Sequence, residues 1–142
     1  MNAMNTMNRV HRFLQWVTRN RFGWNMAGMP VIELTTIGRK SGEHRSTMLT
    51  SPVKDGDSYV VVASKGGSDS HPAWFLNLRD NPSVEVVIEN RPRESRAARI
   101  ATETERARLW PIITSRFANY AGYQEKTERE IPLVLLDSVT PK

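Results

Sequence analysis

The chain has 142 residues, with 20 Lys and Arg, 15 Asp and Glu and no cysteine, which gives it a formal charge of +5. This length is typical of one domain, and the lack of cysteine excludes disulfides and thiol chemistry. No apolar run reaches the roughly 18 residues of a membrane span, and arginines interrupt any secretory signal, so we expect a cytoplasmic protein. Residues 1–45 carry seven Lys and Arg against two acids, which favours an anionic ligand, a nucleic acid or an acidic membrane surface.

The first predicted element is an amphipathic helix over residues 8–20. Its apolar positions follow the i, i+3, i+4, i+7 spacing of one helix face: Val10, Phe13, Leu14 and Val17. Its basic residues lie mostly off this face: Arg9, Arg12 and Arg19. Two interpretations stay open, a helix that packs on the domain and a basic segment that contacts an anionic membrane surface.

Six strands are predicted from β-branched and apolar residues: 31–38, 44–53, 58–64, 83–89, 95–101 and 131–139. The stretch GRKSG (38–42) and the stretch KDGD (54–57) carry turn signals. Pro52 predicts an edge or a bulge in the second strand because proline cannot donate to a ladder.

The remaining segments predict two helices, over 72–82 and 102–117, and two connectors, a glycine-containing loop over 65–72 and a polar segment over 118–130. Thr102 and Glu105 have the spacing of a capping box, and Pro111 is expected to kink or interrupt the helix that follows. Strands joined mainly by hairpins, with few helices, predict the α+β class and a small barrel.

Several familiar sites are absent from the sequence. It contains no glycine pattern of a dinucleotide-binding turn or of a P-loop, and no G-x-S-x-G motif. The Ser, Asp and His of GSDSH (67–71) are sequence neighbours, which seldom adopt the geometry of a triad. The histidines are scattered and no acidic cluster occurs, so we expect no metal site.

Two segments have the composition of an anion site. The hairpin tip offers a planar guanidinium fork, a flexible ammonium and a hydroxyl through Arg39, Lys40, Ser41 and Arg45. The glycine turn follows a strand, and its paired glycines allow backbone N–H groups to approach an oxyanion; it consists of Ser64, Lys65, Gly66 and Gly67. These groups bind one ligand only if the fold brings both segments to one cleft, and the alternative is a solvated basic hairpin.

Aromatic residues beside polar groups are the next candidates. Asn77 lies three positions after Trp74, so one helix face could offer both an amide and a flat ring. Tyr120 and Tyr123 lie in the polar connector, where two phenols could close over a planar ligand. The alternatives are core packing for Trp74 and ordinary edge packing for the tyrosines.

Three stretches together resemble the deazaflavin (F420)-dependent nitroreductase and quinone reductase family of actinobacteria. They are LTTIGRKSGEHRSTML (34–49), VVASKGGSDSHPAWFLNLRDNPSVEVVI (61–88) and ANYAGYQEKTEREIPLVLL (118–136). The resemblance covers about 30 to 140. It implies a split β-barrel of the FMN-binding, pyridoxamine-phosphate-oxidase-like type over 30–142, with an N-terminal amphipathic helix and linker over 1–29.

The resemblance also implies the cofactor, coenzyme F420, a 5-deazaflavin whose tail bears a phosphate and a polyglutamate chain. The phosphate and tail would bind Arg39, Lys40, Ser41 and Arg45, beside the strand residues Ser46, Thr47, Met48 and Leu49. The ring and linker would meet Val62, Ala63, Ser64 and Lys65, and another wall would consist of Ala73, Trp74 and Asn77. Tyr120 matches a tyrosine near the ring, and Tyr123 matches a second one beside the substrate pocket.

The implied reaction is hydride transfer from reduced F420 to an electron-poor acceptor, a quinone, a conjugated enone or a nitroaromatic. Carbon in place of a ring nitrogen favours two-electron transfer, and the protein supplies orientation and a dry pocket. Tyr120 or Ser64 would orient the acceptor and relay a proton. Phe117 and Ala73 depart from residues that some relatives carry, which leaves the identity of the acceptor open.

Three alternatives stay open: a related barrel that uses FMN, a non-catalytic F420-binding protein, and a nucleic-acid-binding protein, for which no motif with interleaved aromatic residues is present.

Barrels of this kind often pair, so a homodimer is an expectation. The helix at 8–20 would place the pocket beside lipid-dissolved quinone on the inner face of the cell membrane.

Overall fold

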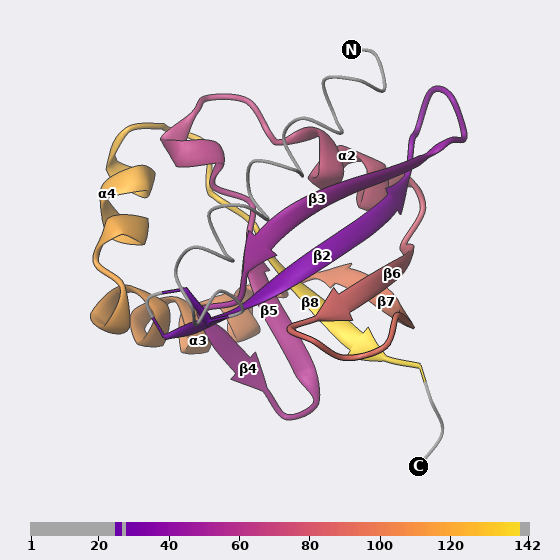
Figure 1. Cartoon of the computed structure of the whole chain (residues 1–142). Coiled ribbons are helices and arrows are strands. Elements are labelled where there is room, and N and C mark those ends of the chain that lie inside the picture. The colour runs from indigo at the N-terminus through magenta and orange to yellow at the C-terminus, as the bar shows by residue number, and fades with distance from the viewer. Residues whose placement is uncertain (1–24, 27, 140–142) are drawn as a thin grey trace.

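The computed structural model describes residues 25–26 and 28–139, and the helix expected at 8–20 lies outside them (Figure 1). The described strands are β1 (Asn25–Met26), β2 (Met29–Ile37), β3 (His44–Thr50), β4 (Val53–Asp55), β5 (Ser58–Val62), β6 (Ser83–Ile88), β7 (Glu94–Ile100) and β8 (Leu133–Ser138). The described helices are the 3-10 turn η1 (Lys65–Gly67), α2 (Ala73–Asp80), α3 (Glu103–Arg116) and α4 (Asn119–Glu125). No helix in this part of the chain has the length and apolar character needed to span a bilayer.

The strands form one antiparallel sheet that curls on itself (Figure 1). Its order is β1-β2-β6-β7-β8-β5-β4, and β3 pairs with β2. The hairpins β2–β3, β4–β5 and β6–β7 join strands that are neighbours in sequence. The predicted α+β class with hairpin-joined strands is therefore confirmed.

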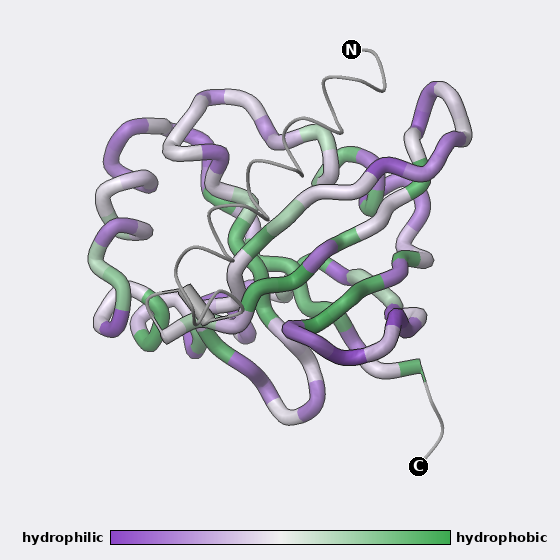
Figure 2. Tube along the Cα trace, in the orientation of Figure 1, coloured by the Kyte–Doolittle hydropathy of each residue, from purple (hydrophilic) through white to green (hydrophobic). Residues whose placement is uncertain are grey.

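Two apolar clusters form the core, and β5 and β8 contribute to both. On β8, Val134 and Leu136 belong to the first cluster, while Leu133 and Leu135 belong to the second. Alternation along a strand places successive side chains on opposite faces of the sheet. Helix α2 covers the first cluster, and α3 and α4 cover the second. Figure 2 shows these central strands as largely hydrophobic and the β2–β3 tip as largely hydrophilic.

The segment predicted as one strand over 44–53 is two strands, β3 and β4, with a corner at Ser51 and Pro52. The Ser51 hydroxyl donates to the carbonyl oxygens of Val60 (2.7 Å) and Val53 (3.0 Å), which fixes this corner against β5. The turn predicted over 54–57 is shorter in the structure, because Lys54 and Asp55 still belong to β4.

The segment 118–130, expected as a connector without secondary structure, contains α4. This helix is stabilised by its inward side chains, since Tyr120 and Tyr123 pack on the second cluster one helical turn apart. The predicted capping box of α3 is confirmed by the bonds Glu105 N to Thr102 Oγ1 (3.1 Å) and Thr102 N to Glu105 Oε1 (2.9 Å). Helix α3 continues through Pro111 rather than ending there.

Candidate active site

The β2–β3 tip presents exposed cations. Arg39 and Lys40 are exposed, and the Arg39 side chain is held in place by Asn77 of α2. The backbone N–H and Nη1 of Arg39 donate to Asn77 Oδ1 at 3.2 Å and 2.9 Å. Arg45 forms an ion pair with Glu43 (3.2 Å), and the Ser41 hydroxyl accepts from the Glu43 N–H.

Asn77 lies inside the protein rather than on an open face. Its side chain is buried, and its Nδ2 donates to Thr36 Oγ1 of β2 at 3.2 Å. Its amide therefore ties α2 to both the strand and the tip of the β2–β3 hairpin. Trp74 is half-buried against the first cluster and packs edge-on against Phe75, while Ala73 is exposed.

The strand residues Ser46, Thr47, Met48 and Leu49 are all half-buried on β3. Ser46 Oγ and Thr35 Oγ1 lie within hydrogen-bond distance (2.8 Å), and Leu49 packs against the first cluster. Among the described strands β3 pairs only with β2, so its other edge offers backbone groups as well as side chains.

The glycine turn follows β5. Val62, Ala63 and Ser64 are buried, whereas Lys65 is exposed and its Nζ donates to Ser70 Oγ (3.2 Å). Three consecutive residues, Lys65, Gly66 and Gly67, have φ values of +47°, +65° and +87°. The Ser64 hydroxyl makes no hydrogen bond to another residue of the described segments.

Both predicted segments connect to α2. The hairpin tip bonds to Asn77, and the glycine turn leads through residues 68–72 into the start of the helix. In Figure 1 the tip and the glycine turn both lie in the upper part of the view, on either side of α2. Their joint action on one ligand stays a prediction.

Tyr120 and Tyr123 come from α4, not from an open loop. Tyr120 is only 7% exposed, its hydroxyl donates to the Met29 sulfur (3.6 Å), and burial raises its pKa. The rings of Tyr120 and Tyr123 meet edge-on at 6.0 Å, and Phe117 meets Tyr120 in the same manner at 6.4 Å. Tyr123 is half-buried and is thus the more accessible phenol.

Arg129 contacts the glycine turn in a way that the sequence did not reveal. Its Nη2 donates to the carbonyl oxygens of Ala63 (3.2 Å) and Ser64 (2.9 Å), and its Nε donates to that of Ser68 (2.7 Å). Its Nη1 lies 3.2 Å from His71 Nδ1. A basic residue in the polar stretch TERE (127–130) carries no signal of such partners.

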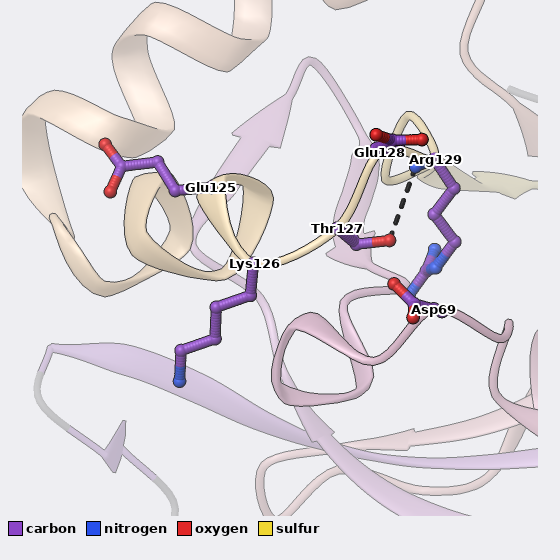
Figure 3. Close-up of a pocket in the computed structure, with 6 residues that line it drawn as sticks. All are labelled: Asp69, Glu125, Lys126, Thr127, Glu128 and Arg129. Atoms are coloured by element: carbon purple, nitrogen blue, oxygen red, sulfur yellow. Dashed lines mark hydrogen bonds between the residues drawn. The ribbon is translucent and has the colours of Figure 1, made fainter.

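Arg129 also lines a surface cavity of about 550 Å³. The other lining residues are Asp69, Glu125, Lys126, Thr127 and Glu128 (Figure 3). None of the residues predicted to bind the cofactor lines this cavity, and three of its side chains are acidic, which does not suit an acidic cofactor tail.

The model of the F420H(2)-dependent quinone reductase family matches residues 7–138. The chain belongs to this family. The reductase is 38% identical over 131 residues to an F420H(2)-dependent quinone reductase of Mycobacterium tuberculosis (strain ATCC 25618 / H37Rv), covering 90% of this chain and 87% of that protein.

Solved structures agree with this assignment. One is a structure of an F420-H2-dependent reductase, with a TM-score of 0.67, 37% identity and coverage of 76% of this chain and 94% of that one. A second, described as a domain-swapped dimer, has a TM-score of 0.68, 32% identity and coverage of 90% and 98%. A pyridoxamine 5'-phosphate oxidase-type protein of Listeria innocua, 15% identical over 78% of this chain and 84% of that one, shares the fold alone at a TM-score of 0.54.

The fold of this reductase is thus the predicted split β-barrel, and the resemblance in the sequence is confirmed. Because the family is F420H2-dependent, the cofactor is coenzyme F420 and the chain is an F420H2-dependent reductase. The FMN-dependent, non-catalytic and nucleic-acid-binding alternatives gain no support from these matches.

Proposed function

We propose that this reductase transfers a hydride from reduced F420 to a quinone-type acceptor, with the β2–β3 tip and the glycine turn holding the cofactor. The observation that carries the proposal is the match of the family model to residues 7–138. Reduced F420 supplies the hydride when bound, and the acceptor takes a proton in addition and leaves as a quinol. The protein's own part is to bind, to orient and to hold donors in place.

The hairpin tip suits the acidic part of F420. Arg39 is fixed in position by Asn77, while Lys40 beside it is exposed, so one cation is rigid and the other adaptable. A guanidinium fork and an ammonium are the groups that recognise phosphate and carboxylate. We assign the phosphate and tail to Arg39, Lys40, Ser41 and Arg45, with β3 alongside.

The ring side of the proposal rests on Ser64, Lys65 and the tyrosines. The Ser64 hydroxyl makes no hydrogen bond to another described residue and lies two residues after the end of β5, which supports a role as a donor to the ring or to the acceptor. Burial holds the pKa of Tyr120 above its ordinary value, so the phenol stays protonated at neutral pH and can donate a hydrogen bond. Tyr123 would form the wall of the acceptor pocket.

The test uses reduced F420 with menadione as the quinone probe and follows the appearance of oxidised F420. With saturating cofactor, Ser64→Ala and Tyr120→Phe should each lower turnover by about tenfold, which corresponds to the loss of one hydrogen bond of about 1.4 kcal/mol. The control is Ser95→Ala, at an exposed position of β7. Unchanged turnover in both variants would contradict the assigned roles, and no quinone-dependent oxidation by the wild type would contradict the proposed reaction.

The proposal includes two binding partners, a second copy of this chain and an anionic membrane surface. A similar solved structure is a domain-swapped dimer, which supports a homodimer that sedimentation velocity would detect. The basic residues of the N-terminal segment support peripheral contact with the inner face of the cell membrane. Co-sedimentation with anionic vesicles, with and without residues 1–20, tests this contact.

A further inference from the structure

Arg129 lies between α4 and β8, and its side chain reaches across to the segment 63–71. One guanidinium donates to the carbonyl oxygen of Ala63 just before the glycine turn, to that of Ser64 at its start and to that of Ser68 just after it. It also contacts the ring of His71, two positions before α2 begins at Ala73. The turn is therefore fastened at both ends by one side chain.

These bonds set the orientation of the peptide groups around Ser64. In a planar trans peptide the C=O and the N–H point in opposite directions. Because the carbonyls of Ala63 and Ser64 point at Arg129, the N–H groups of Ser64 and Lys65 point to the opposite side. Neither N–H donates to another residue in the described part of the chain.

The backbone of the turn needs such support. Lys65 is a non-glycine residue at a φ of +47°, a conformation that costs free energy unless its surroundings impose it. The planar fork of arginine can serve several carbonyl oxygens at once, whereas a lysine ammonium acts as a point charge. Desolvation lowers the pKa of Arg129, and the charge of Asp69, which lies beside its side chain (Figure 3), opposes that shift.

A second contact joins the same parts of the fold. A Cβ on Gly67 would lie 2.7 Å from the carbonyl oxygen of Tyr123, closer than real Cβ atoms approach. The glycine turn thus packs directly on α4, the helix that carries both tyrosines. The close contact of Gly67 and the bonds of Arg129 therefore join the glycine turn to α4 and to the segment that follows it.

We propose that Arg129 is a positioning residue for the cofactor, which holds Ser64 and Lys65 in the orientation that receives F420 without touching cofactor or acceptor. The inference rests on the proposed function, because it assigns the glycine turn to F420. Loss of the Arg129 guanidinium should weaken F420 binding and raise the KM for reduced F420, while kcat at saturating cofactor changes little.

The experiment compares Arg129→Lys and Arg129→Gln with Arg96→Lys. Arg96 is a matched control because its Nη1 donates to the backbone oxygens of Asp57 in the β4–β5 turn (2.6 Å) and of Leu136 in β8 (2.9 Å). Amide deuterium exchange over 63–71 is measured without cofactor, and the Kd of F420 by fluorescence titration. Both Arg129 variants should exchange faster over 63–71 and bind F420 about tenfold more weakly, with kcat within about twofold of wild type. Arg96→Lys should lower the melting temperature and leave both quantities unchanged.

An Arg129→Lys variant with the wild-type Kd overturns the inference, even if its exchange is faster. A wild type that binds no F420 overturns the proposed function instead, and the exchange data then report whether Arg129 fixes the turn at all. If neither Arg129 variant folds, the test is amide deuterium exchange of the wild type, measured with and without F420. Binding must slow exchange over residues 63–68, and unchanged exchange there overturns the inference.

Discussion

Asn77 and Arg129 act on segments that carry predicted cofactor residues, and both do so through hydrogen bonds inside the protein. Asn77 holds the Arg39 backbone and guanidinium, and Arg129 holds the carbonyl oxygens around Ser64. Asn77 is buried, and a buried polar side chain with its partners satisfied stabilises one arrangement, because any alternative leaves those groups without hydrogen bonds. Arg129 is thus a positioning residue outside the predicted cofactor contacts, whereas Asn77, itself one of those predicted contacts, also fixes Arg39.

His71 makes the Arg129 contact sensitive to pH. Burial lowers the pKa of His71 below 6.5, and the charges of Arg129 and Arg79 lower it further, so the neutral ring accepts the Arg129 hydrogen bond. The unfolded chain takes up a proton at higher pH than the folded one, so this stabilisation is present above pH 6.5 and is lost as the pH falls below it.

The variant His71→Gln removes this titration and keeps a side chain that can accept the bond. Between about pH 7.5 and 5.5 the free energy of unfolding of the wild type should fall more steeply than that of His71→Gln. Urea unfolding at several pH values measures both curves. Parallel curves would show that His71 does not contribute to the pH dependence.

The candidate site was predictable where residue type alone carries the chemistry. The exposed cations of the tip and the glycines with positive φ lie where the sequence placed them. Arg129 was not predictable, since its partners lie 58 to 66 residues away and none of them is a charged side chain. The inward orientation of Asn77 was missed for the same reason, because its partner Thr36 is 41 residues away.

At the scale of single elements, local signals decide where α3 begins. The capping box at Thr102 satisfies the backbone N–H groups of Thr102 and Glu105 at the helix start, and the Glu105 carboxylate also accepts from Arg99 Nη1 of β7 (2.7 Å). The bond from Arg99 and the Thr102 N–H lower the pKa of Glu105 to about 2. This carboxylate therefore stabilises the fold fully above pH 4.5 and loses that contribution as the pH falls toward 2.

Thr102→Ala should lower the free energy of unfolding by about 1 kcal/mol, because it leaves the Glu105 N–H without its cap. The matched control is Thr104→Ala, at an exposed helical position where alanine is the better helix former. Chemical denaturation of the wild type and the two variants gives the free energies of unfolding to be compared. Equal stability of the two variants would contradict a role for the cap.

The strands with long apolar runs and the capped helix were predictable because their signals are local. Helix α4 was not, since a seven-residue helix has no stability of its own and is held by packing of Tyr120 and Tyr123. The break between β3 and β4 was also missed, because the Ser51 bond to Val60 that fixes the corner is a tertiary contact.

Across the whole molecule, β5 and β8 tie the two apolar clusters into one cooperative unit. Each strand places alternate side chains in the two clusters, so neither cluster can open without disrupting the strands that the other needs. The barrel and the helical layer of α3 and α4 should therefore unfold together.

Leu135→Ala and Leu136→Ala test this on opposite faces of β8, since both residues are fully buried but in different clusters. Each should cost about 2–5 kcal/mol, and far-UV and near-UV circular dichroism should still report one coincident transition. Ile100→Ala, at a residue that is 44% exposed, should change stability by no more than about 0.5 kcal/mol. A separate early transition in Leu135→Ala would show that the helical layer melts independently.

Burial on both faces also removes the usual source of strand alignment. A strand with one wet face resists a one-residue slip because the slip would expose its apolar side chains, whereas β8 would exchange one buried set for another. The polar bonds at its end discriminate instead: Ser58 Oγ and Arg99 Nε both donate to the Asp137 carboxylate, and Arg96 donates to the neighbouring Leu136 carbonyl. Because Ser58 lies on β5 and Arg99 on β7, the Asp137 carboxylate favours one register of β8 against both neighbouring strands.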